Sequence, residues 1–243
     1  MNTSADYRND DARLDDADRA IVATARDFAR EHVAPHAAAW EHERRMPADA
    51  LRRAAEAGLC GLFVARDLGG LGAGRRAVAR VLEELAGECM AFAFSLVVHN
   101  NLTGNIAANG NDDQKARYLP PMLSGERIGA FSLTEPGAGS DAAGITTAAW
   151  RDGDGWVIEG EKAWVTNGNT AEILSAYVQT DASAGWRGIA CVMVDAEAPG
   201  VERLPAYPLL GTHGLGTNGF RSLAAGSRMQ MCYWLPATAS KRP

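Results

Sequence analysis

Residues 131–141 read Phe131-Ser132-Leu133-Thr134-Glu135-Pro136-Gly137-Ala138-Gly139-Ser140-Asp141, and the pattern of the chain changes around this segment. Two glycines, a proline and small polar side chains predict a loop here rather than a strand. Gly137 and Gly139 let a ligand approach the backbone closely, and successive N–H groups in such a loop can bind an anion. A plain surface turn is the alternative interpretation of the same residues.

The residues before this segment carry a helical pattern. Apolar side chains within 18–33 recur at three- and four-residue intervals and predict one stripe of a helix, formed by Ile21, Val22, Ala25, Phe28, Ala29 and Val33. A second stripe lies within 77–85, and the weakly charged stretch 90–98 is typical of a helix buried on most sides. Asn111 is expected to cap a short helix that ends at Pro120 and Pro121.

The residues after the segment carry a strand pattern. Residues 149–158 form two extended runs around Asp152-Gly153-Asp154-Gly155, which predicts a hairpin. Residues 173–179 and 189–194 are further β-rich runs, and no helical stripe separates them. We therefore predict an α+β chain, with an N-terminal all-α helical domain over 1–125 and a small, mainly antiparallel β-domain over 126–220.

The overall composition excludes several classes of protein. Hydrophobic residues make up 47% and charged residues 22%, as in globular proteins, and the net charge of -6 argues against a nucleic-acid partner. No apolar run approaches the roughly 20 residues of a membrane span. Four scattered cysteines and an acidic N-terminus, unlike a signal peptide, predict a cytoplasmic protein.

Two segments resemble the acyl-CoA dehydrogenase family. Residues 131–141 resemble the family's signature, and Gly160-Glu161-Lys162-Ala163-Trp164-Val165-Thr166-Asn167-Gly168 resembles its second flavin-contacting segment. Leu68-Gly69-Gly70-Leu71-Gly72, His99 and residues 114–120 also match. The resemblance extends to about Phe220.

This resemblance implies a fold of three parts: an N-terminal helical domain, a middle β-domain and a C-terminal four-helix bundle. It implies FAD between the last two parts, usually in a homo-oligomer. The family removes two hydrogens from an acyl-CoA thioester: a glutamate takes the α-proton, and the β-hydrogen leaves as hydride to flavin N5. Reduced flavin then passes its electrons to an electron-transfer flavoprotein.

The resemblance also assigns cofactor-binding residues, namely Phe131, Ser132, Leu133, Thr134, Gly139, Ser140, Trp164, Val165 and Thr166. Thr134, with backbone groups of 131–133, is our candidate for the pyrimidine edge of the flavin, where negative charge develops. Trp164 offers a flat face to the ring, and Thr166 a hydroxyl near N5. Ser140 is assigned to the acyl-CoA substrate or to the flavin phosphates.

Each assignment has a structural alternative. Trp164 could be a core residue, and Thr134 and Thr166 ordinary loop hydroxyls. Glu135 lies beside the flavin segment but is not our candidate for the catalytic base. No metal site is predicted, because His32 and His36 lie one helical turn apart without a third ligand.

The end of the chain does not resemble the family. The family's catalytic glutamate lies in the C-terminal bundle, so no catalytic residue is predicted within these 243 residues. Residues 221–243 do not resemble the family, and 227–236 lack the strand alternation expected there. We interpret 221–243 as an aberrant tail produced by a frameshift near 220–223. A β-domain that lacks its last strand would expose a sheet edge. We expect such a chain to bind FAD poorly and to turn over no acyl-CoA.

Three functional interpretations remain open at this point. The first is a truncated, FAD-dependent acyl-CoA dehydrogenase homologue. The second is a related flavoenzyme, such as an acyl-CoA oxidase, a nitroalkane oxidase or a flavin monooxygenase. The third is a non-catalytic binding fragment.

Overall fold

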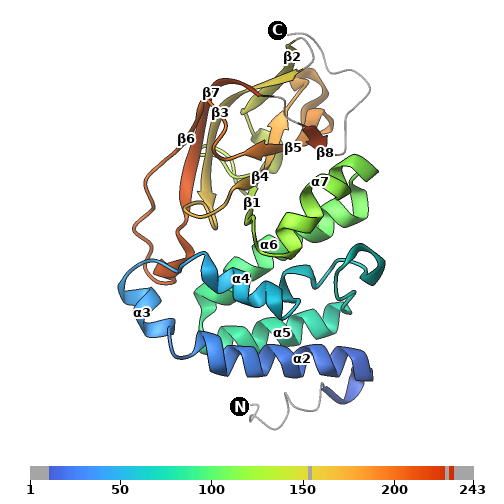
Figure 1. The fold of residues 1–243 in the computed structure, drawn as a ribbon. Helices are drawn as coiled ribbons and strands as arrows, with labels where there is room; N and C mark the ends of the chain where they lie inside the picture. Colours follow the sequence, from blue (N-terminus) through green and yellow to red (C-terminus); the bar gives the residue numbers. More distant parts are fainter. Residues whose placement is uncertain (1–10, 153–154, 228–229, 233–243) are drawn as a thin grey trace.

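The computed structural model describes residues 11–152, 155–227 and 230–232 and divides the chain into a helical half and a sheet half (Figure 1). The change falls between the last helix, which ends at Leu123, and the first strand, which begins at Gly129. The predicted α+β class is therefore confirmed. Among the described residues, no helix combines the length and apolarity needed to cross a membrane.

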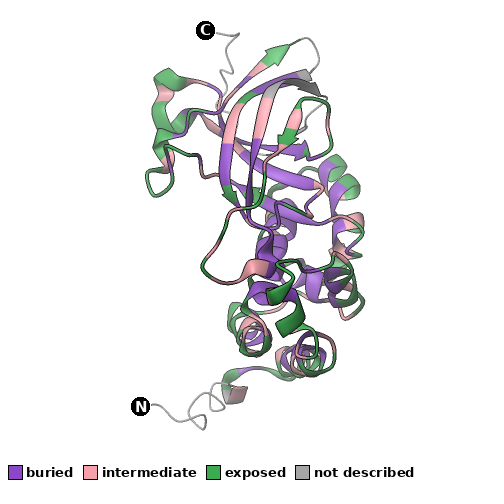
Figure 2. Ribbon diagram, turned by 90° about the vertical axis from the view of Figure 1, so that its left-hand side faces the viewer, coloured by how far each residue is buried: buried purple, intermediate pink, exposed green. Residues whose placement is uncertain are grey.

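The helical half packs around a core shared by several amphipathic helices. The main helices are α2 (Asp16–Phe28), α3 (Ala37–His42), α4 (Asp49–Glu56), α5 (Arg75–Glu88), α6 (Met90–Asn109) and α7 (Asp112–Leu123). The predicted stripe is confirmed: Ile21, Val22, Ala25 and Phe28 are buried on α2, and Ala29 and Val33 are buried in the π-helical turn that follows. Buried residues run through these helices and into the strands above them (Figure 2).

Helix α6 is buried on most sides, as its low charge predicts. Its buried residues include polar ones, and each of these finds a partner. Asn100 accepts a hydrogen bond from the Leu62 N–H (2.8 Å) and donates to the Leu59 carbonyl (2.8 Å), so it fixes the turn that packs on the helix. These bonds satisfy polar groups whose burial would otherwise cost free energy.

Helix α7 begins as predicted and ends later than predicted. Asn111 and Gln114 form a reciprocal capping box at its N-terminus. Pro120 and Pro121 lie inside the helix, so the prediction that they end it is wrong. A proline lacks the N–H donor and its ring crowds the carbonyl four residues earlier, but its own carbonyl can still accept. The Ser124 N–H donates to the Pro120 carbonyl (3.1 Å), and this bond closes the last turn.

The sheet half is one curled sheet of mainly antiparallel strands. Its strands are β1 (Gly129–Ser132), β2 (Ala148–Asp152), β3 (Gly155–Val165), β4 (Ile173–Gln179), β5 (Ile189–Asp195), β6 (Val201–Arg203), β7 (Asn218–Ser227) and β8 (Gln230–Cys232). The order is β6-β7-β3-β2-β4-β5-β8, with β1 parallel to β4. The predicted hairpin is β2–β3, paired from Ala148↔Glu159 to Asp152↔Gly155.

The tail differs from its expectation. Strand β7 continues past Phe220 to Ser227, with Gly226 opposite Val157, and β8 pairs with β5. Strand pairing uses backbone groups, which every non-proline residue supplies whatever its side chain, so weak alternation does not prevent a strand. Residues 228–229 and 233–243 lie outside the described residues, and the frameshift stays a prediction.

The two halves meet where α6 and α7 contact the start of β1. The fully buried His99 ring donates from Nε2 to the Met122 carbonyl (3.0 Å) and accepts at Nδ1 from the Gly129 N–H (3.1 Å). Asn167, which follows β3, accepts from the Ser95 hydroxyl (2.5 Å) and donates to the Gly129 carbonyl (3.2 Å). These bonds fix the strand that leads into the 131–141 segment.

Candidate functional site

The 131–141 segment continues β1 into a tight loop. Phe131 and Ser132 close the strand, and the backbones of Glu135 and Ala138 hydrogen-bond to each other in both directions (2.8 and 3.2 Å). A Cβ added at Gly137 would meet nothing within 4 Å, and one at Gly139 would lie 3.7 Å from the Thr134 methyl. The fold itself therefore does not require glycine at 137, which leaves close approach by a ligand as a physical reason for it.

The structure brings the two family-like segments together. The Ala163 N–H on β3 donates to the Thr134 carbonyl (2.8 Å), so the loop lies directly beside the strand that carries Trp164. The hydroxyls of Thr134 and Thr166 are partly exposed, and neither makes a hydrogen bond within the described part of the chain. They are available as donors to a ligand.

Trp164 projects from an irregular point in β3. The register of β3 against β7 shifts between Lys162 and Val165, and Trp164 has a positive φ of 57°. Such a φ is costly for a bulky residue, and irregularities of this kind often re-aim a side chain at a functional site. The indole is 57% exposed and packs on the Tyr207 ring, with the centroids 4.3 Å apart. Trp164 is therefore a surface residue and not part of the core.

The other predicted residues fall into two groups. The side chains of Ser132 and Val165 are buried inside the sheet, so only their backbone groups can reach a ligand. Gly139 and Ser140 lie exposed on the loop, Leu133 is partly exposed, and Phe131 is exposed, with its ring 5.1 Å from that of Tyr177. The flavin assignments of these residues stay predictions.

Sequence reasoning missed a buried ion pair behind the loop. Lys162 Nζ lies 2.7 Å from Glu135 Oε1, and the two side chains are 5% and 4% exposed. Burial alone would raise the pKa of Glu135, but Lys162 and the Thr146 and Thr147 amides lower it to about 2. Burial lowers the pKa of Lys162, an effect that the attraction of Glu135 offsets in part. Because the Glu135 carboxylate is already fully engaged, it is unsuited to take a proton from a substrate.

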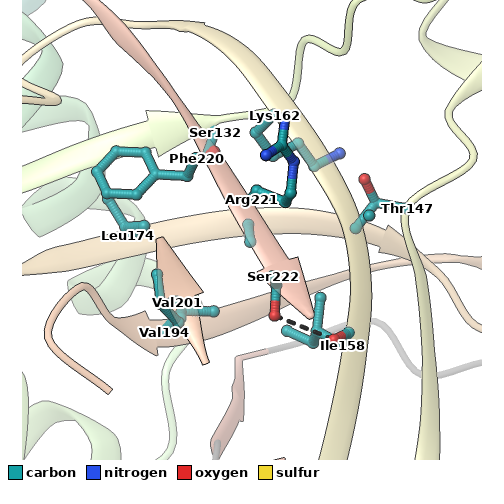
Figure 3. Close-up of a pocket in the computed structure, with 12 residues that line it drawn as sticks. Ser132, Thr147, Ile158, Lys162, Leu174, Val194, Val201, Phe220, Arg221 and Ser222 are labelled. Atoms are coloured by element: carbon teal, nitrogen blue, oxygen red, sulfur yellow. Dashed lines mark hydrogen bonds between the residues drawn. The ribbon is translucent and has the colours of Figure 1, made fainter. Parts of the chain in front are cut away.

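A small cavity lies inside the sheet next to Lys162 (Figure 3). Its volume is about 30 Å³, and its lining comes from several strands, among them β1, β3 and β7. The hydroxyls of Ser132 and Thr147 line it and have no hydrogen-bond partner within the described residues. The cavity is too small for a flavin or an acyl group.

A larger groove opens on the surface beside the loop. It has a volume of about 470 Å³, and its lining includes Asn105 of α6, Leu133, Tyr177 and the exposed Trp186. Apolar walls with a few polar groups are typical of small-molecule sites. Among the described residues, no three His, Cys, Asp or Glu side chains gather as metal ligands.

Sequence comparison places this geometry in a known family. Residues 15–126 match the N-terminal domain of acyl-CoA dehydrogenases, and residues 130–222 match the middle domain. The chain belongs to the acyl-CoA dehydrogenase family. The mitochondrial isobutyryl-CoA dehydrogenase of Dictyostelium discoideum is 35% identical over 193 residues, which are 79% of this chain and 46% of that protein.

Solved structures share this fold. A chain from the solved structure of the electron transferring flavoprotein of Acidaminococcus fermentans superposes on this chain with a TM-score of 0.86 and is 27% identical to it. The superposition covers 91% of this chain and 59% of the other. A glutaryl-CoA dehydrogenase of Mycobacterium smegmatis in complex with FADH2 gives 0.80 at 29% identity, covering 87% and 54%. The present chain thus spans about half the length of the acyl-CoA dehydrogenases that it matches.

Proposed function

We propose that this chain supplies the helical and β-domain parts of an FAD-dependent acyl-CoA dehydrogenase. The observation that carries the proposal is the hydrogen bond from Ala163 to Thr134, which joins two family-like segments into one surface with free hydroxyls and an exposed indole. The solved glutaryl-CoA dehydrogenase with FADH2 supports FAD as the cofactor.

The residues of this surface fit a flavin ring. Thr134 and the backbone near Leu133 would bind the pyrimidine edge, and donors held there stabilise charge that develops during reaction. The open face of Trp164 would pack against the ring, while Tyr207 supports its other face. Thr166 would donate a hydrogen bond beside the reactive edge. Bound FAD would take up the hydrogen that leaves the β-carbon of the acyl group.

The substrate class is an acyl-CoA thioester. Ser140 lies exposed on the loop, and Leu133 lines the 470 Å³ groove, so we propose that the substrate lies along this side of the β-domain. No residue of this chain is proposed as the base that removes the α-proton. We further propose that the electron acceptor is an electron-transfer flavoprotein. The protein is proposed to form a homo-oligomer and to be cytoplasmic.

A flavin titration with two tryptophan variants tests the proposal. Trp164 and Trp186 are similarly exposed, at 57% and 55%, but only Trp164 belongs to the proposed flavin surface. We expect saturable quenching of flavin fluorescence by the purified chain, weakened at least about tenfold in Trp164→Ala, since a lost aromatic packing surface costs on this scale. Trp186→Ala should bind like the unaltered chain. Equal losses in both variants, or no saturable quenching at all, would contradict the proposal.

A further inference from the structure

The Glu135–Lys162 ion pair lies directly behind the proposed flavin loop. Both side chains are almost completely buried, and their charged atoms are 2.7 Å apart. Removing two charges from water is costly, and a buried ion pair often stabilises a fold no better than apolar side chains of the same size. Stability alone is therefore a weak reason for placing two charges at this point.

The pair holds consecutive residues of the loop. Lys162 Nζ donates to the Leu133 carbonyl (3.0 Å), and the neighbouring Ala163 N–H donates to the Thr134 carbonyl (2.8 Å). The same Nζ also donates to Glu135 Oε1 (2.7 Å). The path of residues 133–135 is thus fixed by two adjacent residues of β3.

The Glu135 carboxylate is also held by a second segment of the chain. The segment that leads into β2 donates to Glu135 three times: from the Thr146 N–H (2.7 Å), the Thr146 hydroxyl (2.9 Å) and the Thr147 N–H (2.9 Å). Hydrogen bonds to an ionised acceptor are stronger and more directional than neutral ones. The loop is therefore clamped between β3 and the start of β2.

We propose that Lys162 and Glu135 are positioning residues, which set the placement of Thr134 relative to Trp164 without contacting the flavin themselves. Trp164 follows Lys162 by two residues on β3, so a shift of the loop against Lys162 changes the spacing between the hydroxyl and the indole. Binding groups must be held closely to their productive geometry, and supporting residues provide this. The inference rests on the proposed function, because the spacing matters only for a ligand that contacts both residues.

Hydrogen exchange tests the positioning without any flavin. The variants are Lys162→Met and Glu135→Gln, with Glu161→Gln as a matched control, because Glu161 neighbours Lys162 on β3 and pairs with Arg221 at the surface (2.9 Å). In the apo chain, we expect the Ala163 amide to exchange at least about tenfold faster in Lys162→Met, since its acceptor is no longer fixed. The control should stay within about twofold. Unchanged Ala163 exchange in Lys162→Met would overturn the proposal, whether or not FAD binds.

Measurements of FAD affinity show whether the Glu135–Lys162 pair positions the loop or only stabilises the fold. The titration is made at a temperature at which circular dichroism shows every variant folded. We expect the single variants to bind FAD at least about tenfold more weakly, the scale of one lost charge-assisted hydrogen bond. In the double variant Glu135→Gln/Lys162→Met no unpaired buried charge remains, so its melting temperature should recover, whereas its affinity should stay low.

The outcomes are distinguishable. If affinity recovers together with melting temperature in the double variant, the pair is only structural and the proposal is overturned. If the unaltered chain shows no saturable FAD binding, the proposed function fails, and the exchange of Ala163 still decides whether the pair positions the loop.

Discussion

The imidazole of His99 accepts a hydrogen bond from the Gly129 N–H and so joins the central helix to the first strand. Because Nδ1 accepts, the ring proton must lie on Nε2, which donates to the Met122 carbonyl. Burial lowers the pKa of His99 to about 4 from its ordinary 6.5, against the bond to Met122, which raises it. A protonated ring would present a second N–H to the Gly129 donor, so the junction requires the neutral form.

This junction predicts a loss of stability in mild acid. As the pH falls below 6.5, the unfolded chain binds a proton at His99 while the folded chain does not until about pH 4. The free energy of unfolding should therefore fall through this window, by about 1.4 kcal/mol per pH unit from this group. Urea unfolding of the unaltered chain and of His99→Gln between pH 7 and 5 measures the difference.

The variant His99→Gln removes the titrating ring, so its pH dependence over this range should be flatter. His32→Gln, at a part-exposed position on the helical half, serves as the control for losing a histidine, and its urea midpoint at pH 7 should lie close to that of the unaltered chain. Parallel pH profiles for the unaltered chain and His99→Gln would show that the junction does not require a neutral His99.

Two substitutions at Asn167 separate the free-energy cost of its positive φ from the cost of losing its hydrogen bonds. It is buried, has a φ of 64° and bonds to Ser95 and Gly129. Asn167→Ala should lower the free energy of unfolding by roughly 3 kcal/mol, because buried partners lose their bonds. Asn167→Gly loses the same bonds but tolerates the positive φ, so it should be more stable than the alanine variant by about 1 kcal/mol. Equal urea midpoints for the two variants would contradict the strain argument.

Replacing Gly137 by alanine should weaken FAD binding without lowering the stability of the fold. No atom lies within 4 Å of a Cβ added there, and its φ is not positive. Gly137→Ala should therefore melt within a few degrees of the unaltered chain, but it should bind FAD more weakly if a ligand approaches this backbone. Gly87→Ala on α5 is the control, since its added Cβ also meets nothing within 4 Å and lies away from the loop. Equal FAD affinities of both variants would contradict the close approach.

Local patterns in the sequence predicted the elements well. The apolar stripe of α2 and the Asn111 cap depend on residues within two turns of each other, so periodicity and capping chemistry suffice to find them. The end of α7 was predicted wrongly, because a proline removes one donor but the helix still gains the packing of its last turn.

Long-range partners could not be predicted in the same way. Lys162 contacts Glu135 across 27 residues, and Trp164 packs on Tyr207, which lies in a loop without a recognisable pattern. The available signal for the ion pair is the rarity of lysine: Lys115, Lys162 and Lys241 are the only three in the chain, and Lys162 lies on β3 next to the buried Ala163. A buried strand seldom carries a lysine unless an acidic partner faces it.

The most direct test of the account is a map of amide chemical shifts as FAD is added to the ¹⁵N-labelled chain. It detects weak binding and assigns it to residues. We predict saturable shifts concentrated at residues 131–140 and 164–166, on both sides of the Ala163–Thr134 hydrogen bond. Shifts confined to another surface, such as the exposed faces of α4 and α5, or the absence of saturable shifts, would contradict the claim that these two segments form a flavin-binding surface.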